Sequence, residues 1–290
     1  AYYGNPYYDS LGNLYSEGGA VSLESVTSEL GVVGVRSSGG TLQVSNSLLQ
    51  KNSLDGLHMI NVSAPVILNS SFLSNTRYAA YLNLSGMALD TSQVEGNNSS
   101  NNARNGWVLE TSPTGSSLLV GTPAGMPYVV KGMTVNSGAS LEVEAGAEIK
   151  MEAGTVFVTN GVLSVTGTSA EPVIFTSIKD DNVSGDTNHD GSLSSPAVGD
   201  WYEVFVSSSG SAELEHTLLR YGGAFRGYPY YDTLGNLYNE DGITSLESVT
   251  STLGTNGMKS NGGTVMIQHS TFMSNTTGVL LTGNITNTSV

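Results

Sequence analysis

Short apolar runs, separated by glycine, asparagine and serine, continue through the whole chain. Between residues 128 and 176 each run has two to four residues, several alternate with polar residues, and most are separated by turns that contain Gly. Such runs are too short and too rich in β-branched residues for helices, whereas alternation with a period of two is typical of half-buried strands. The pattern therefore predicts an all-β chain of short strands.

A long internal repeat gives these strands an order. Residues 224-275 repeat residues 1-52 without a gap, so that Ala224 corresponds to Ala1, and more than half of the paired positions are identical. Because both ends of the sequence fall inside the repeated motif, we expect little more than one period of a longer tandem array. On this view residues 1-100 are the C-terminal part of one period, and residues 101-290 start the next.

A shorter repeat of about 22 residues, the length of a single solenoid coil, lies inside the long one. It reads polar, Ser, any residue, apolar, two variable residues, Asn, and it ends at Asn52, Asn75, Asn97 and Asn275. A unit of this length cannot bury its own apolar face, so it must stack on a neighbour as one coil of a β-solenoid. We expect the Asn at a coil corner, since Asn tolerates the left-handed conformation and can hydrogen-bond from coil to coil.

Other features of the repeat predict corners, a connection and the length of the rod. Gly39-Gly40 and Gly262-Gly263 indicate a second corner. The run from Asn97 to Asn105 is the most linker-like part of the chain and is predicted to connect two blocks of coils. With strands stacked about 4.8 Å apart, a period of roughly ten coils would rise roughly 48 Å.

The middle of the chain resembles a known superfold. The run from Ala139 to Met151, followed by Pro172-Val173-Ile174-Phe175-Thr176-Ser177 and then by Gly199-Asp200-Trp201, looks like the right-handed parallel β-helix repeats of bacterial secreted and surface proteins, the pectin-lyase-like superfold. The resemblance implies a right-handed parallel β-helix and an extracellular or cell-surface location. It implies little about activity, because this superfold carries lyases, hydrolases, phage tailspikes and adhesins.

An acidic insertion carries the sharpest local motif, Asp186-Thr187-Asn188-His189-Asp190-Gly191. It matches the opening of a calcium loop, in which alternate side chains face one cation and Gly permits the sharp turn. Ala197 stands where the loop's last acid is expected, so a neighbouring acid such as Glu203 would complete the ligand shell. We expect a structural Ca²⁺; a merely solvated acidic loop is the alternative. The predicted metal ligands are Asp186, Asn188, Asp190, Asp180, Asp181 and Asp200.

A second insertion is rich in tyrosine. Residues 230-238 read as a β-hairpin with its turn near Gly235-Asn236, since tyrosines on the two arms can pair across the strands. The hairpin would either pack against the solenoid or contact another protein or a sugar.

Composition narrows the classes of partner. The chain has ten basic residues, a net charge of −15 and no cysteine. This charge argues against nucleic acid and anionic membranes, and it favours divalent cations. No apolar run approaches the ~20 residues needed to span a bilayer. The absence of cysteine excludes a disulfide scaffold and is compatible with secretion.

The sequence predicts a structural function. None of the basic residues lies in a recognisable lyase motif, and the only adjacent pair of aspartates, Asp180-Asp181, lies in the acidic loop. We therefore predict no catalytic residue and expect a tandem-repeat extracellular rod, stalk or filament, with adhesion as an extension of that function. Its partners would be other copies of itself, stacked or covalently continuous, and surface glycans. The alternative is a calcium-dependent polysaccharide lyase or hydrolase.

Overall fold

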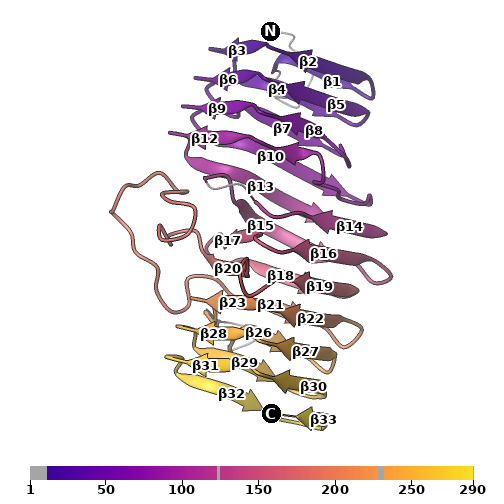
Figure 1. The fold of residues 1–290 in the computed structure, drawn as a ribbon, viewed down its shortest axis with the longest axis vertical. Helices are drawn as coiled ribbons and strands as arrows, with labels where there is room; N and C mark the ends of the chain where they lie inside the picture. The colour runs from indigo at the N-terminus through magenta and orange to yellow at the C-terminus, as the bar shows by residue number, and fades with distance from the viewer. Residues whose placement is uncertain (1–11, 123–124, 228–231, 290) are drawn as a thin grey trace.

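The protein is an all-β solenoid. A computed structural model describes residues 12-122, 125-227 and 232-289, and within them the regular structure is β throughout, with no helix. Parallel strands stack into about 12 turns along the long axis of the molecule (Figure 1). This confirms the predicted parallel β-helix; its right-handedness stays a prediction.

The first four coils contribute three strands each. These are β1 (Gly12–Glu17), β2 (Ala20–Glu24), β3 (Thr27–Glu29), β4 (Val33–Ser38), β5 (Thr41–Ser45), β6 (Leu48–Gln50), β7 (Leu57–Ile60), β8 (Val66–Leu68), β9 (Ser71–Leu73), β10 (Tyr78–Ser85), β11 (Val94–Glu95) and β12 (Asn98–Ser100). The first strand of each coil joins a long sheet in the order β1-β4-β7-β10. The second and third strands form two four-stranded sheets, β2-β5-β8-β11 and β3-β6-β9-β12.

The long sheet continues past residue 100 without a break and then forks. It runs through β13 (Arg104–Ser112) to β15 (Tyr128–Val135). The first half of β15 pairs with β17 (Glu148–Met151), and its second half pairs with β18 (Val156–Thr159). From this point the single long strand of each coil is replaced by two strands that lie one after the other along the same sheet.

The later coils follow this divided plan. Their strands are β14 (Ser116–Leu119), β16 (Ser140–Glu144), β19 (Val162–Thr166), β20 (Val173–Ser177), β21 (Glu203–Val206), β22 (Ser211–Glu215), β23 (Thr217–Arg220), β26 (Gly235–Asn239), β27 (Ile243–Glu247), β28 (Thr250–Thr252), β29 (Asn256–Ser260), β30 (Gly263–Gln268), β31 (Thr271–Met273), β32 (Thr277–Leu281) and β33 (Ile285–Ser289). One branch of the fork is β17-β20-β23-β28-β31, the other is β18-β21-β26-β29-β32, and a separate sheet runs β14-β16-β19-β22-β27-β30-β33.

Alternate side chains of these strands fill the interior. In the sheet that contains β5, Val44 pairs in register with Ile67, and Ile67 pairs with Val94. All three side chains are buried. Stacking removes apolar surface from water at every coil, which is the main source of stability in a solenoid. The alternation in the sequence therefore predicts the inward and outward faces correctly.

The long repeat recurs strand by strand. β2, β3 and β6 reappear as β27, β28 and β31, and every boundary is shifted by the same amount. The left-handed residues shift too: Ser25 and Ser248 both have φ 55°. Along β1-β4-β7-β10-β13-β15-β18-β21-β26 one period takes eight steps, or roughly 38 Å at about 4.8 Å a step. The prediction of ten coils was wrong, because the middle of the period has longer coils and an insertion.

Asparagine forms a ladder, as predicted, although it is not the left-handed residue there. Asn52 N–H donates to Asn75 Oδ1 at 3.1 Å, and Asn75 N–H donates to Asn102 Oδ1 at 2.8 Å. The positive φ falls one residue earlier, at Lys51 and Ser74 (φ 53° and 56°). The predicted glycine corner is confirmed: Gly40 has φ 70°, and a Cβ there would lie 1.9 Å from a backbone oxygen.

Two predictions for the region around residue 100 were wrong. Asn97 does not belong to the Asn52–Asn75 ladder; its Oδ1 accepts from Ser70 N–H at 2.9 Å in a second ladder. Nor is the run from Asn97 to Asn105 a linker, since β12 pairs with β9 and Asn97, Asn102 and Asn105 are buried. The division of the chain at residue 100 stays a prediction.

Both predicted insertions are present, and they leave the stack at the same corner. The acidic loop lies between β20 and β21 (Figure 1). The Tyr-rich insertion lies between β23 and β26 and contains the hairpin of β24 (Phe225–Arg226) and β25 (Asp232–Thr233). Residues 228-231, between these two strands, lie outside the described ranges. The predicted turn near Gly235-Asn236 was wrong, because these residues begin β26 in the parallel sheet.

Candidate functional site

The acidic loop is fastened to the side of the solenoid by polar contacts. Asn105 N–H donates to Thr187 O at 2.8 Å, and Asn105 Nδ2 donates to Asp186 O at 3.0 Å. Lys150 Nζ donates to Gly185 O at 2.8 Å and to Thr187 Oγ1 at 2.7 Å. Burial lowers the pKa of Lys150 to about 8, although nearby carboxylates, Asp180 first among them, oppose the change. The loop is therefore anchored to β13 and β17, on coils that precede its own.

Two of the predicted metal ligands are paired with cations of the protein at the base of the loop. Asp180 is fully buried; it accepts from Arg220 Nη2 at 2.5 Å and from Thr176 Oγ1 at 2.6 Å. Asp200 forms an ion pair with Lys179 at 2.7 Å. These carboxylates close the two ends of the insertion, so their negative charge is already compensated.

Three other predicted ligands lie together in the loop itself. Asp186 accepts from the N–H groups of Asp190 (3.1 Å) and Gly191 (2.9 Å), which folds the motif into a tight turn. Asn188 Nδ2 donates to Asp190 Oδ2 at 2.8 Å. The side-chain oxygen of Asn188, Oδ1, and the other carboxylate oxygen of Asp190, Oδ1, are buried and have no hydrogen-bond partner. Unpaired buried oxygens of this kind are the ligands that Ca²⁺ prefers.

Asp181 lies near this turn. Its pKa is raised, first by burial and next by the carboxylates of Asp186 and Asp190. No group of three His, Cys, Asp or Glu side chains among the described residues is arranged so that it could hold a metal ion. The oxygens of Asp186, Asn188 and Asp190, with Asp181 beside them, are nevertheless of the kind that calcium prefers as ligands.

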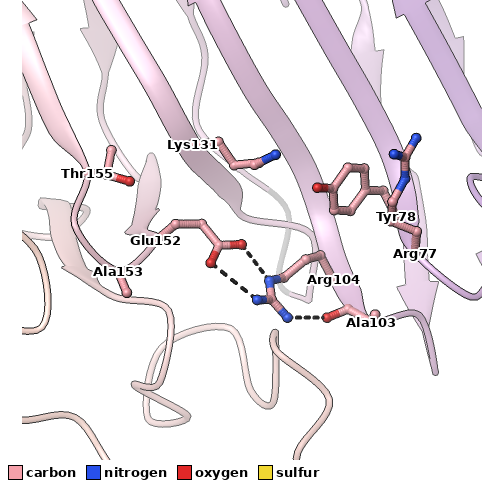
Figure 2. Close-up of a pocket in the computed structure, with 8 residues that line it drawn as sticks. All are labelled: Arg77, Tyr78, Ala103, Arg104, Lys131, Glu152, Ala153 and Thr155. Carbon is pink, nitrogen blue, oxygen red and sulfur yellow. Dashed lines mark hydrogen bonds and ion pairs between the residues drawn. The ribbon is translucent and has the colours of Figure 1, made fainter.

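A hollow of about 430 Å³ opens on the outer face of the long sheet (Figure 2). It lies where β15 gives way to β17 and β18, and its walls come from β10, β13, β15 and the turn that follows β17. Its lining residues are Arg77, Tyr78, Ala103, Arg104, Lys131, Glu152, Ala153 and Thr155.

Each cation of the hollow has a carboxylate partner. Arg104 donates from Nε to Glu152 Oε1 at 2.5 Å and from Nη2 to Oε2 at 3.2 Å, as Figure 2 shows. Lys131 Nζ lies 3.7 Å from Glu110 Oε2. Arg77 is paired with a third, fully buried carboxylate. Each cation of the hollow therefore lies beside a carboxylate, one of which, Glu152, itself lines the hollow.

Aromatic rings extend from the hollow along the sheet. Tyr78 lines it, and Tyr81 stacks against Tyr78 with ring centroids 5.5 Å apart. The His58 ring, on the preceding coil, has its centroid 4.8 Å from that of Tyr81. Beneath the two tyrosines lies a separate apolar cluster that includes Ile178, from the start of the acidic loop. We call Tyr78, Tyr81 and His58 the aromatic shelf.

Sequence reasoning missed the hollow. Its residues come from four elements between positions 77 and 155 and form no local motif. One signal was available: Arg77, Arg104 and Lys131 are equally spaced (104 − 77 = 131 − 104), in a chain with only ten basic residues. Equal spacing of rare residues in a solenoid places them on one face.

Comparisons with protein-family models, curated proteins and solved structures found no match. Within the described ranges, no helix has the length and hydropathy needed to cross a membrane.

Proposed function

We propose that the protein is a rigid, tandem-repeat rod whose function is structural, as a stalk or filament outside the cell or on its surface. The recurrence of whole coils carries the proposal. Because β27, β28 and β31 repeat β2, β3 and β6 at one constant offset, a further period can stack on the last coil with the same pairing.

The physics of a solenoid supports this function. Each coil contacts only its neighbours, so added periods lengthen the rod without a new fold. An uncovered end coil presents unpaired backbone N–H and C=O groups, which pair readily with another strand. Neighbouring copies of the chain, covalently joined or stacked head to tail, would cover these groups. Copies of itself are therefore the partner that the proposal names first.

Location and superfold belong to the same proposal. The sequence around Ala139 to Met151 resembles secreted and surface β-helix proteins of the pectin-lyase-like type, and a right-handed helix would accompany that assignment. The absence of cysteine and the strong negative charge suit an exported protein exposed to divalent cations.

We also propose a structural Ca²⁺ in the acidic loop. The buried, unpaired oxygens of Asn188 and Asp190 support it, as does the tight turn closed by Asp186. The ion would hold the turn in place and reduce repulsion between its carboxylates. It would thereby stiffen the insertion against the side of the rod.

Electron microscopy of the native protein, with and without a calcium chelator, tests the rod. Filaments with an axial repeat of roughly 38 Å, made less straight by the chelator, are expected. Discrete particles with no tendency to align end to end would contradict the proposal. Release of unsaturated or reducing sugars from polysaccharides by the purified chain would instead favour the alternative, a polysaccharide lyase or hydrolase.

A further inference from the structure

The hollow on the long sheet has the size and lining of a ligand site. Its volume of about 430 Å³ falls within the range of roughly 300–1,000 Å³ that is usual for small-molecule sites. Tyr78 supplies a partly exposed ring at its edge, over which Arg77 and Lys131 lie at 4.7 and 5.5 Å from the ring centroid, and the shelf continues through Tyr81 and His58. A chain-like ligand could therefore occupy the hollow with one unit and lie on the shelf with the next.

The charges of the hollow select against an ionic ligand. Glu152 holds the Arg104 guanidinium through two oxygens, and Glu110 lies beside Lys131. An anion would have to displace these carboxylates or lie close to them, and a cation would meet the guanidinium groups. Asp190 of the acidic loop adds another negative charge within electrostatic range of Arg104. An uncharged ligand meets neither penalty.

The same ion pairs suit hydroxyl groups. A guanidinium and a carboxylate that face each other keep N–H donors and oxygen lone pairs at their rims, and a hydroxyl can accept from the first while it donates to the second. A pyranose ring combines such hydroxyls with an apolar C–H face, which packs against an aromatic ring. Sugar residues therefore match both the paired charges and the shelf.

We propose that the hollow and the aromatic shelf bind a neutral glycan chain, with one sugar residue against Tyr78 and between the Arg104–Glu152 and Lys131–Glu110 pairs. The shelf follows β10 from Tyr78 to Tyr81 and then passes to His58 on the preceding coil, so the glycan runs along β10 before it crosses to the neighbouring strand. The inference rests on this site alone and not on the proposed rod, and it gives the chain an adhesive activity.

The test is titration of the whole chain with defined oligosaccharides, followed by calorimetry and by saturation transfer from aromatic protons. The neutral probes are maltotetraose, cellotetraose, mannotetraose and N-acetylchitotetraose, and trigalacturonate is the acidic comparator. We expect at least one neutral probe to bind with a Kd of about 1 mM or lower. We expect trigalacturonate to bind at least about tenfold more weakly than that probe.

Substitutions locate the binding. Tyr78→Ala should weaken it about tenfold, because a central aromatic contact is lost, while Tyr78→Phe keeps the ring and should stay within about threefold. Tyr15→Ala is the matched control, since Tyr15 is an exposed tyrosine of the same sheet outside the hollow. Absence of binding by all four neutral probes, tighter binding of trigalacturonate, or equal binding by Tyr78→Ala would each overturn the proposal. None of these results depends on whether the chain forms rods.

Discussion

Asp55 holds the guanidinium of Arg77 on the next coil through both of its carboxylate oxygens. Arg77 Nε lies 2.7 Å from Oδ1 and Nη2 lies 2.5 Å from Oδ2. The Asp55 side chain is fully buried, whereas that of Arg77 is 40% exposed. His58 Nδ1 also lies 2.8 Å from Asp55 Oδ2. This carboxylate therefore fixes one wall of the hollow and one end of the shelf.

Removal of the Asp55 charge should destabilise the chain. Asp55→Asn leaves Arg77 without its counter-ion, and we expect a loss of about 2 kcal/mol in the free energy of unfolding, less than for a fully buried pair because Arg77 is partly solvated. Urea denaturation at neutral pH measures it. A loss as small as that caused by Glu95→Gln, an exposed acid of another sheet, would contradict this role.

The same carboxylate predicts a pH dependence. Burial alone would raise the pKa of Asp55, but hydrogen bonds and charge from Arg77 and His58 outweigh it, so that the pKa is lowered from its ordinary value of 3.8. The stabilisation is therefore complete above about pH 4 and is lost as the pH falls through the folded-state pKa. The stability difference between the wild-type chain and Asp55→Asn should shrink as the pH falls below about 4. A stability difference that does not change with pH would contradict this role of the Asp55 carboxylate.

Lys150 predicts a pH dependence of the same sign in the alkaline range. Its folded-state pKa of about 8 lies below the ordinary value of 10.5, so the unfolded chain binds more protons between these two values. The cost of burying the charge is fully present below pH 8 and is relieved as the pH rises toward 10.5. The free energy of unfolding should therefore be larger at about pH 9.5 than at about pH 7.5. Lys150→Met should abolish this difference. An unchanged slope in Lys150→Met would show that another group titrates.

The asparagine ladder should be sensitive to a single substitution. Asn75→Ala removes the acceptor of the Asn52 N–H and the donor to Leu49 O, and both groups are buried in the stack. We expect a loss of about 3 kcal/mol, since each unpaired buried group costs about 1–3 kcal/mol. Asn98→Ala, at an exposed position of β12, should change stability by less than about 0.5 kcal/mol. Equal effects of the two variants would mean that the ladder adds nothing.

Calcium should bind the acidic loop directly. Calorimetric titration of the metal-free chain with CaCl₂ is expected to show a Kd of about 10⁻⁴ to 10⁻³ M, typical of extracellular sites. Asp190→Asn should weaken it at least about tenfold, while Glu95→Gln, with the same loss of charge elsewhere, should leave it unchanged. If Asp190→Asn and the wild-type chain bind calcium alike, the ion lies elsewhere.

Local sequence patterns predicted most of the fold, because each coil of a solenoid is formed by residues that are close together in the sequence. Alternation marks which side of a strand faces the interior, as at Val44 and Ile67, and the long repeat places β27 on the pattern of β2 before any contact is known. Register is harder to predict. The fourth coil has extra residues between β10 and β11, so the ladder advances 27 residues from Asn75 to Asn102, and the Asn found at the expected spacing, Asn97, belongs to its neighbour.

The sites show where sequence reasoning stops. The sequence predicted Asn236 as a turn residue. Its buried side chain instead accepts a hydrogen bond from Gly222 N–H at 2.7 Å and so stabilises the coil corner at Gly222. Asp180 looked like a free ligand, but Arg220, at the end of β23, reaches it through the stack. The hollow depends on the fork in the long sheet, which arises from pairing between strands and leaves no mark on any one segment.

Because of the fork, insertions can lengthen the chain without changing the distance between stacked coils. The turn between β17 and β18, the acidic loop between β20 and β21 and the Tyr-rich insertion between β23 and β26 open at one corner on three successive coils, while the strands on either side keep their pairing. This corner is a seam. Foreign peptides grafted into it would be displayed in a row, one coil apart, on a scaffold whose core has no part in holding them.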